Sequence, residues 1–311
     1  MSTDLPDRIG PYTVIARLDR KGPEPVYKVT GGDGRTLAVK LYAAGESEEL
    51  IRLRLEAVAK ASGLRHPALI RYEQAGEHEG RAFAAMELVP STKLLGRALP
   101  LHRTLRAMQQ IAEGLGYLHS LGMVHGCLNA SRALVSLDGN NAKITESGMC
   151  PETSSAAMAA TATMQAARLV RYLPPEMRRA AAPDPDPRGD IYSFGVLFYE
   201  VLTGKLPEGK FLLPSQESDE VPPELDEVVL RCLREDPAAR YQTARELVKA
   251  IDRVRGSLPG GLDRHLEAIT STARGVLGGQ NGPRGGRRWP ALAVLGAAAL
   301  VAGVFLMRAC S

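Results

Sequence analysis

The residues that could carry out chemistry are few and well separated along the chain. Lys40 and Glu56 supply a cation and a carboxylate near the N-terminus, and Glu146 supplies a second carboxylate further on. Cys127 offers a thiol, which is mostly protonated at neutral pH and is therefore a poor proton acceptor. Arg132 carries a permanent charge and has no acceptor atom for a metal. Which of these residues share a site depends on the elements that position them.

The composition is that of a globular chain with a modest charge. Of the 311 residues, 44% are hydrophobic and 24% are charged, which excludes a disordered or collagen-like protein. The formal net charge is +4, and Lys and Arg are spread along most of the chain. We therefore predict no nucleic-acid surface. The four cysteines show no CxxC or metal-ligand spacing, so that no metal site is predicted.

Strand-like segments come first along the chain and helical segments follow. Alternating apolar residues predict strands that include Tyr12–Leu18, Pro25–Thr30, Thr36–Tyr42 and Arg81–Val89. Apolar residues at helical spacing predict helices at Glu48–Ala61, Thr104–Leu121, Ile191–Leu202, Glu224–Leu233 and Ala244–Val254. This order predicts an α+β fold with a small β-rich N-terminal lobe and a helical C-terminal lobe.

Several motifs in the same order resemble the bacterial eukaryotic-like (Hanks-type) serine/threonine protein kinases, over about residues 10–255. They are LAVK at Leu37–Lys40, HPALI at His66–Ile70, VHGCLNASRALV at Val124–Val135, YLPPE at Tyr172–Glu176, GDIYSFGVLFYEVLTGKLP at Gly189–Pro207 and DPAAR at Asp236–Arg240. The resemblance implies a bilobal protein-kinase-like fold. It also implies structural roles for His125 in the catalytic loop, for Asp190 as its brace, and for an ion pair between Glu176 and Arg240.

The same resemblance implies that most catalytic groups of the family are replaced. Phosphoryl transfer by this family needs a Gly-rich loop, a Lys–Glu pair, an Asp base, and an Asn and an Asp that bind Mg²⁺. Lys40 and Glu56 would form the pair, which either holds phosphates or only fixes the first helix. The base position is Cys127, the neighbouring cation position is Asn129, the metal-binding Asn position is Arg132, and the metal-binding Asp position is Glu146.

The phosphate loop is also altered. Within Leu18–Val29, the residues Asp19, Lys21 and Glu24 stand where the family has three glycines. Asp19 and Glu24 would place carboxylates near phosphate anions, unless the segment is only a β-turn. Cys127 is either a reactive thiol or, as we prefer, a small buried apolar side chain. These replacements indicate a degenerate kinase, or pseudokinase, and make Mg²⁺ binding doubtful.

The apolar side of a nucleotide site is retained in the alignment with the family. Val26, Ala38 and Leu134 match positions that stack on adenine, Met86 matches the gatekeeper, and the hinge runs from Glu87 to Val89. ATP therefore stays a candidate ligand, with Arg132 offsetting phosphate charge in place of a metal. The alternative is that these residues only fill the space between the lobes and join them.

The C-terminal segment predicts a membrane anchor. Pro290–Met307 contains no charged residue, and as a helix it would be about 27 Å long, close to the hydrocarbon thickness of a bilayer. Trp289 at its edge favours the interface. Arg284, Arg287 and Arg288 precede the span and Arg308 follows it, which predicts that the kinase-like domain faces the cytoplasm from the inner membrane.

The predicted domains follow from these features. They are an N-terminal tail (1–9), a protein-kinase-like domain (10–255), a Gly/Arg-rich juxtamembrane linker (256–288), a transmembrane helix (289–307) and a short C-terminal tail (308–311). Gly296, Ala299 and Gly303 would allow two spans to approach closely, so that a homodimer is one candidate state; the alternative is that these are only the small residues common in membrane spans.

Three functions fit the sequence, and the third of them is a nucleotide sensor without transfer chemistry. The first is a membrane-anchored pseudokinase that binds kinases, phosphatases or cell-envelope proteins as a signalling module or scaffold. The second is a weakly active ATP-dependent serine/threonine protein kinase that uses Lys40 and Glu146 without a base, because phosphoryl transfer depends chiefly on positioning.

Overall fold

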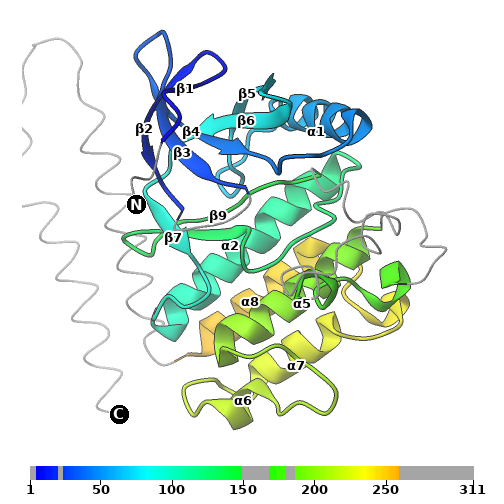
Figure 1. Ribbon diagram of the computed structural model, residues 1–311. Helices are drawn as coiled ribbons and strands as arrows, with labels where there is room; N and C mark the ends of the chain where they lie inside the picture. The colour runs from blue at the N-terminus through cyan, green and yellow to red at the C-terminus, as the bar shows by residue number, and fades with distance from the viewer. Residues whose placement is uncertain (1–4, 20–23, 149–167, 179–185, 259–311) are drawn as a thin grey trace, which may run out of the picture. The chain divides into compact units, whose positions relative to one another are not determined.

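The computed structural model describes residues 5–19, 24–148, 168–178 and 186–258. In the view of Figure 1, a β-rich N-terminal lobe lies above a helical C-terminal lobe, which is the bilobal α+β arrangement predicted from the sequence. The predicted linker and membrane span fall beyond residue 258, outside the described residues. Among the helices of the described ranges, none is long and apolar enough to cross a membrane.

A six-stranded antiparallel sheet forms the N-terminal lobe, in the order β1-β2-β3-β4-β6-β5. The strands are β1 (Arg8–Ile9), β2 (Tyr12–Arg17), β3 (Val26–Thr30), β4 (Thr36–Leu41), β5 (Tyr72–His78) and β6 (Arg81–Glu87). Alternation along β4 places Leu37 and Val39 in a small core on one face of the sheet. Ala38 belongs to the main core on the other face. Lys40 shares the face of Ala38 and is thereby directed between the lobes.

Helix α1 (Glu48–Ala61) packs against β5 and β6. Its first turn is capped because the Ser47 hydroxyl accepts a hydrogen bond from the Leu50 N–H at 3.3 Å. The buried residues of the helix are Ile51, Arg54, Val58 and Ala61, which recur every three or four positions on one face. This face therefore carries a buried cation among apolar side chains.

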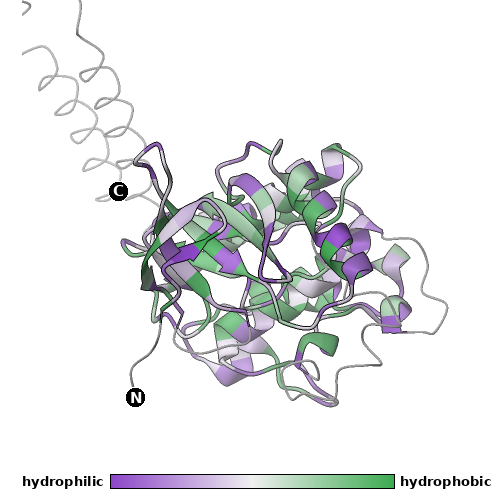
Figure 2. Ribbon diagram, turned by 45° about the horizontal axis from the view of Figure 1, so that its top comes forward, coloured by the Kyte–Doolittle hydropathy of each residue, from purple (hydrophilic) through white to green (hydrophobic). Residues whose placement is uncertain are grey.

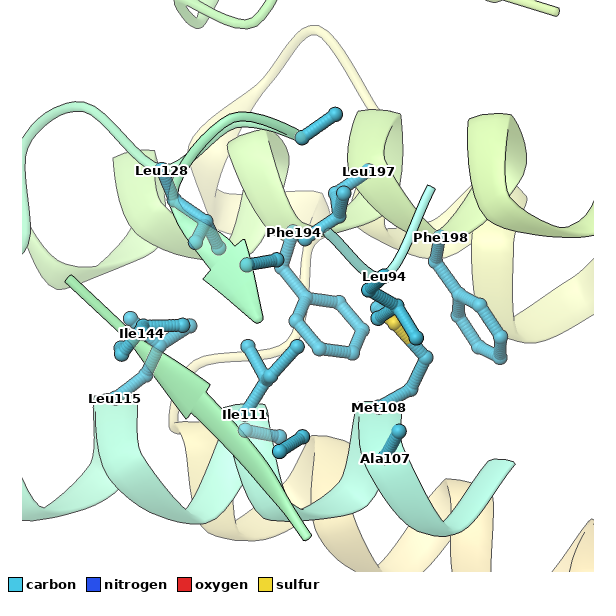
Figure 3. Close-up of a cluster of buried hydrophobic side chains, with 14 of the residues drawn as sticks. Leu94, Ala107, Met108, Ile111, Leu115, Leu128, Ile144, Phe194, Leu197 and Phe198 are labelled. Carbon is cyan, nitrogen blue, oxygen red and sulfur yellow. The ribbon is translucent and has the colours of Figure 1, made fainter. Parts of the chain in front are cut away.

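The C-terminal lobe is a cluster of helices around one large core. Its helices are α2 (Leu101–Ser120), α5 (Pro187–Thr203), α6 (Pro214–Glu217), α7 (Glu224–Cys232) and α8 (Ala244–Ser257), with short 3-10 turns η2 (Pro175–Arg178) and η3 (Pro237–Ala239). Helix α2 packs against α8 and α5, and α5 packs against α7. Figure 3 shows Met108 and Ile111 of α2 beside Phe194 and Phe198 of α5 in this core.

Local signals explain the bounds of the central helix α5. The Asp186 carboxylate accepts a hydrogen bond from the Arg188 N–H, and Pro187 occupies the first turn, where a missing N–H costs nothing. Gly204 ends the helix with a φ of +73°, a conformation that glycine adopts without strain. In Figure 2 the helices show both green and purple segments, as expected for helices with one buried and one exposed face.

A second, three-stranded sheet connects the lobes. It contains β7 (Ser91–Lys93), β8 (Ala133–Ser136) and β9 (Ala142–Ile144). The Ile144 N–H donates to the Ala68 carbonyl at 2.8 Å, and the Ile70 N–H donates to the Ile144 carbonyl at 3.0 Å. These bonds fix the end of β9 against the segment that leads into β5. Glu146, two residues later, is thereby placed next to the N-terminal lobe.

Candidate functional site

Glu146 is the centre of the site between the lobes, and two cations hold it. Its Oε1 lies 2.5 Å from the Lys40 Nζ, and its Oε2 accepts bonds from the Arg132 guanidinium, with Nη2 at 2.8 Å. The Tyr72 hydroxyl oxygen accepts a hydrogen bond from the Glu146 N–H at 3.0 Å. Both carboxylate oxygens and the backbone N–H of Glu146 are therefore engaged within the protein.

The electrostatics of Glu146 follow from this arrangement. Burial favours the neutral acid, but the positive charges of Arg132 and Lys40 outweigh burial and hold the pKa of Glu146 far below its ordinary value. Its φ of +62° lies in the left-handed region, which is strained for a residue with a side chain. The two ion pairs hold the residue in this conformation.

Lys40 has two carboxylate partners, and neither comes from helix α1. Besides Glu146, the Glu24 Oε2 lies 2.7 Å from its Nζ. Burial lowers the pKa of Lys40, but Glu146 and Glu24 together raise it above its ordinary value. The structure does not bring Lys40 to Glu56. That residue is half exposed and pairs with Arg52 one turn away, because its position in the helix faces solvent.

Arg54 occupies the inward face of α1 instead. Its side chain is 3% exposed, and its guanidinium lies 2.8 Å from Glu46 Oε1 and 3.7 Å from Glu24 Oε1. It also lies over the ring of Tyr42, 4.3 Å from the centroid. We call the connected set Glu24, Lys40, Glu46, Arg54, Arg132 and Glu146 the interlobe ion network.

Asp190 braces the catalytic loop. Its Oδ2 accepts a bond from the His125 N–H at 2.8 Å, and its Oδ1 accepts one from the Gly126 N–H at 2.8 Å. His119 Nε2 lies 2.9 Å from Oδ2. The pKa of His125 is lowered to about 4, because burial disfavours the imidazolium. His125 is therefore a neutral structural residue at physiological pH.

The two remaining catalytic-loop positions are occupied by buried residues. Asn129 donates from Nδ2 to the Cys127 carbonyl at 2.9 Å, and its Oδ1 accepts bonds from the N–H and hydroxyl of Ser131. Its amide therefore holds the loop's own backbone. The sulfur of Cys127 lies 3.8 Å from His125 Nδ1. Position 127 thus presents no carboxylate to a substrate hydroxyl.

These residues do not fit Mg²⁺, the metal that the family implies. Mg²⁺ needs carboxylate, carbonyl or water oxygens. Here the guanidinium of Arg132 lies against Glu146 and also donates to the Cys127 carbonyl at 3.3 Å. A permanent cation therefore occupies the place of one metal ligand and engages the other. We derive no metal-dependent step for this site.

The apolar residues expected near adenine lie together. Ala38 and Met86 are directly paired across β4 and β6, and both are buried. Val26 and Leu134 are partly buried and pack against the same core. At the hinge, the Glu87 carboxylate binds Lys143 at 2.8 Å, and the Val89 carbonyl accepts a bond from the Ser91 hydroxyl at 3.1 Å. The structure therefore brings the four apolar residues into, or against, one apolar core.

A further pair anchors the segment that follows the catalytic loop. The guanidinium of Arg240, which is fully buried, binds both oxygens of Glu176 at 2.6 and 2.8 Å. Tyr172 and Arg168 both donate to the buried carboxylate of Glu200, and the Tyr172 hydroxyl oxygen accepts the Ala130 N–H at 3.3 Å. These contacts fix the backbone beneath the site.

Sequence reasoning missed three charged residues here. Arg54 and Glu46 were not singled out, although Arg54 recurs with Ile51 and Val58 on the apolar face of α1, a pattern readable from the sequence. Lys93 was missed as well. It donates to the Ser131 carbonyl, and burial lowers its pKa although Glu146 opposes this. No motif marks Lys93, because β7 is only three residues long.

Comparison with known proteins agrees with this geometry. A model of the protein tyrosine and serine/threonine kinase family matches residues 24–251. Serine/threonine-protein kinase PknL of Mycobacterium tuberculosis is 31% identical over 258 residues, which cover 75% of this chain and 63% of PknL. A probable serine/threonine-protein kinase of Streptomyces coelicolor is 30% identical over 294 residues, which cover 86% of this chain and 43% of that protein.

A solved structure shows the same fold. The crystal structure of the PknI kinase domain of Mycobacterium tuberculosis superposes with a TM-score of 0.64 at 22% identity, covering 79% of this chain and 97% of that domain. The chain spans only part, 43% and 63%, of the two relatives named above. The family implies ATP binding. The chain belongs to the bacterial Hanks-type serine/threonine protein kinase family.

Proposed function

We propose that this chain is a pseudokinase, which uses the kinase fold as a binding module and does not transfer phosphate. One observation carries the proposal: both oxygens of Glu146 are held by cations of the protein itself, Lys40 and Arg132. The carboxylate that would bind the metal is thereby neutralised, and the metal would have to approach a fixed positive charge. The sulfur at position 127 and the inward-bonded Asn129 support the same conclusion.

A transfer assay with the full chain in detergent tests this proposal. Labelled ATP, a generic protein substrate, and Mg²⁺ or Mn²⁺ are supplied to the wild type and to Lys40→Met. We expect no transfer by the wild type above the level of Lys40→Met. Metal-dependent transfer that is lost in Lys40→Met would overturn the proposal.

We also propose that the chain binds the adenine part of a nucleotide without a metal. The support is the apolar pair Ala38 and Met86 beside Val26 and Leu134. Thermal shift with ATP, with and without Mg²⁺, measures this binding. We expect a shift that Mg²⁺ does not increase, and no shift at millimolar ATP would remove the idea.

A weakly active kinase is the second candidate, and the comparisons favour it over inactivity. The relatives named above are called serine/threonine-protein kinases. In addition, Lys40 is retained, and Glu146 keeps a carboxylate at the position of the family's Asp, 2.5 Å from the Lys40 Nζ. Loss of a general base alone costs about 10²–10⁴ in rate, so that slow transfer is compatible with the family. The same assay, run to long times, separates the two candidates.

For localisation, we propose a single-pass anchor at residues 289–307 with the kinase-like domain in the cytoplasm. The support is the uncharged run Pro290–Met307 and the arginines that precede it. Membrane fractionation of the full chain against a chain ending at Arg255 tests the anchor, and cross-linking of the same pair tests the homodimer. Recovery of protein partners with the full chain from solubilised membranes tests the scaffold role.

A further inference from the structure

Glu24 lies between two cations that belong to different elements. Its Oε2 is 2.7 Å from Lys40 of β4, and its Oε1 is 3.7 Å from Arg54 of α1. Each oxygen of one carboxylate therefore faces one cation. This is the charge pattern that a bound phosphate group would have, with negative oxygens shared between a lysine and an arginine.

The neighbouring backbone fixes the base of the segment that carries Glu24. The Leu18 N–H donates to the Val26 carbonyl at 2.7 Å. The Asp19 carboxylate accepts the Val26 N–H at 3.0 Å and is bound by Arg17. These bonds join the end of β2 to the start of β3. Glu24, two residues before the start of β3, is therefore close to a fixed part of the backbone.

The interlobe ion network is balanced in charge. Its three cations are Lys40, Arg54 and Arg132, and its three carboxylates are Glu24, Glu46 and Glu146. An incoming anion would therefore add negative charge to a set that is already neutral. Binding becomes more favourable when one of the carboxylates leaves, because like charges in a poorly hydrated site repel strongly.

Glu24 is the carboxylate that can leave. Its side chain is 28% exposed, whereas those of Glu46 and Glu146 are 8% and 11% exposed. Because Glu24 is the most exposed of the three, its carboxylate rotates into water at the lowest cost in free energy. Glu46 is bound by two nitrogens of Arg54 and Glu146 by two separate cations, so that both remain in place.

We propose that Glu24 is an internal anion that closes a polyphosphate-binding site formed by Lys40 and Arg54. Triphosphate, free or as part of a nucleotide, binds these cations in competition with the Glu24 carboxylate. While the Glu24 carboxylate occupies the site, its negative charge weakens the binding of phosphate groups. This concerns binding only and holds whether or not the chain transfers phosphate, so that its test is separate from that of the proposed function.

The test measures binding of three probes to the full chain without metal: inorganic tripolyphosphate, ATP and adenosine. Isothermal titration compares the wild type with Glu24→Gln. We expect Glu24→Gln to bind tripolyphosphate and ATP on the order of tenfold more tightly, because one opposing charge is removed. Adenosine, which has no phosphate, should bind the two proteins equally. A gain for ATP without a gain for tripolyphosphate would overturn the proposal.

Two further variants make the result specific. Glu73→Gln removes one negative charge from a carboxylate that pairs with Arg71 on the sheet and is no part of the network, and it should leave all three affinities unchanged. Adding Lys40→Met to Glu24→Gln should cancel the gain. An equal gain in Glu73→Gln, or no phosphate binding by folded Glu24→Gln, contradicts the proposal. Glu24→Ala serves as a second variant, and circular dichroism confirms folding of each.

Discussion

The guanidinium of Arg132 lies 2.8 Å from the carboxylate of Glu146, at the two positions where the kinase family carries its metal-binding Asn and Asp. An Asn and an Asp together contribute one negative charge, whereas an Arg and a Glu together contribute none. This pair therefore carries one negative charge less than the family's pair, and the Arg132 guanidinium has no oxygen that could bind a metal.

The first prediction concerns the Arg132–Glu146 pair itself. Arg132→Met should lower the free energy of unfolding by about 3 kcal/mol, because Glu146 would be buried with only one of its two cations. Arg52→Met is the matched control. It removes an exposed partner of Glu56 on α1 and should change stability by less than about 0.5 kcal/mol. Chemical unfolding of the full chain, followed by circular dichroism, measures both; equal losses would contradict the prediction.

The second prediction concerns the charged residue of α1 that faces the site. Arg54→Met should destabilise the protein by about 3 kcal/mol, because it leaves the buried carboxylate of Glu46 without its cation. Glu56→Gln, on the same helix, should be nearly neutral, because its side chain is half exposed. The midpoint of thermal unfolding distinguishes them. A large loss of stability in Glu56→Gln would contradict this prediction and support the Lys40–Glu56 ion pair that the family resemblance implies.

The fold was largely predictable from the sequence, for reasons visible in particular elements. Buried residues recur every three or four positions in helix α8 and at every second position in strand β3. The places of both elements could therefore be predicted to within a few residues. Strand β5 was not predicted. Its sequence YEQAGEH is polar, and it forms a strand because β6 pairs with it along its whole length. Such tertiary pairing leaves no local signal.

Contacts of the site could be predicted only where a family motif implies them. Asp190 and Arg240 were assigned from motifs; in the structure the Asp190 carboxylate accepts the His125 N–H, and the Arg240 guanidinium binds Glu176. The carboxylate partners of Lys40 were not all predicted. A motif selects a carboxylate by its type and its spacing along the chain, and it does not say which way the side chain points. The helix register places Glu56 in solvent and Arg54 inside. The rotation of one helix about its axis thus decides which charge enters the site.

The third prediction is a pH dependence of stability. His125 is buried and its pKa is lowered to about 4 from 6.5, mainly by burial, with Asp190, Arg132 and Glu146 as its charged neighbours. Below pH 6.5 the unfolded chain takes up the proton first. Stability is therefore lost as the pH falls from 6.5 to 4, by about 2–3 kcal/mol from this residue.

The variant His125→Gln isolates this contribution. Its stability should fall less steeply than that of the wild type between pH 6.5 and 4.5, because Gln takes up no proton. His102→Gln, at the exposed start of α2, should keep the slope of the wild type. Parallel slopes for His125→Gln and the wild type would show that His125 is not held neutral in the folded protein. The measurement is urea unfolding at a series of pH values.

The fourth prediction concerns Arg240, whose five N–H groups each meet an acceptor. Two go to the oxygens of Glu176, and the others go to the carbonyls of Arg234, Glu235 and Arg188, at 2.8 to 3.0 Å. An ammonium has three donors on one atom and cannot reach acceptors spread around a planar fork.

Arg240→Lys should therefore destabilise the protein by about 3 kcal/mol although the charge is kept, because it leaves buried carbonyls unpaired. Arg231→Lys is the control, since Arg231 is exposed and only lies over the ring of Tyr241. It should change stability by less than about 1 kcal/mol. If thermal unfolding shows Arg240→Lys to be as stable as Arg231→Lys, charge alone holds Glu176, and the five-bond geometry contributes nothing.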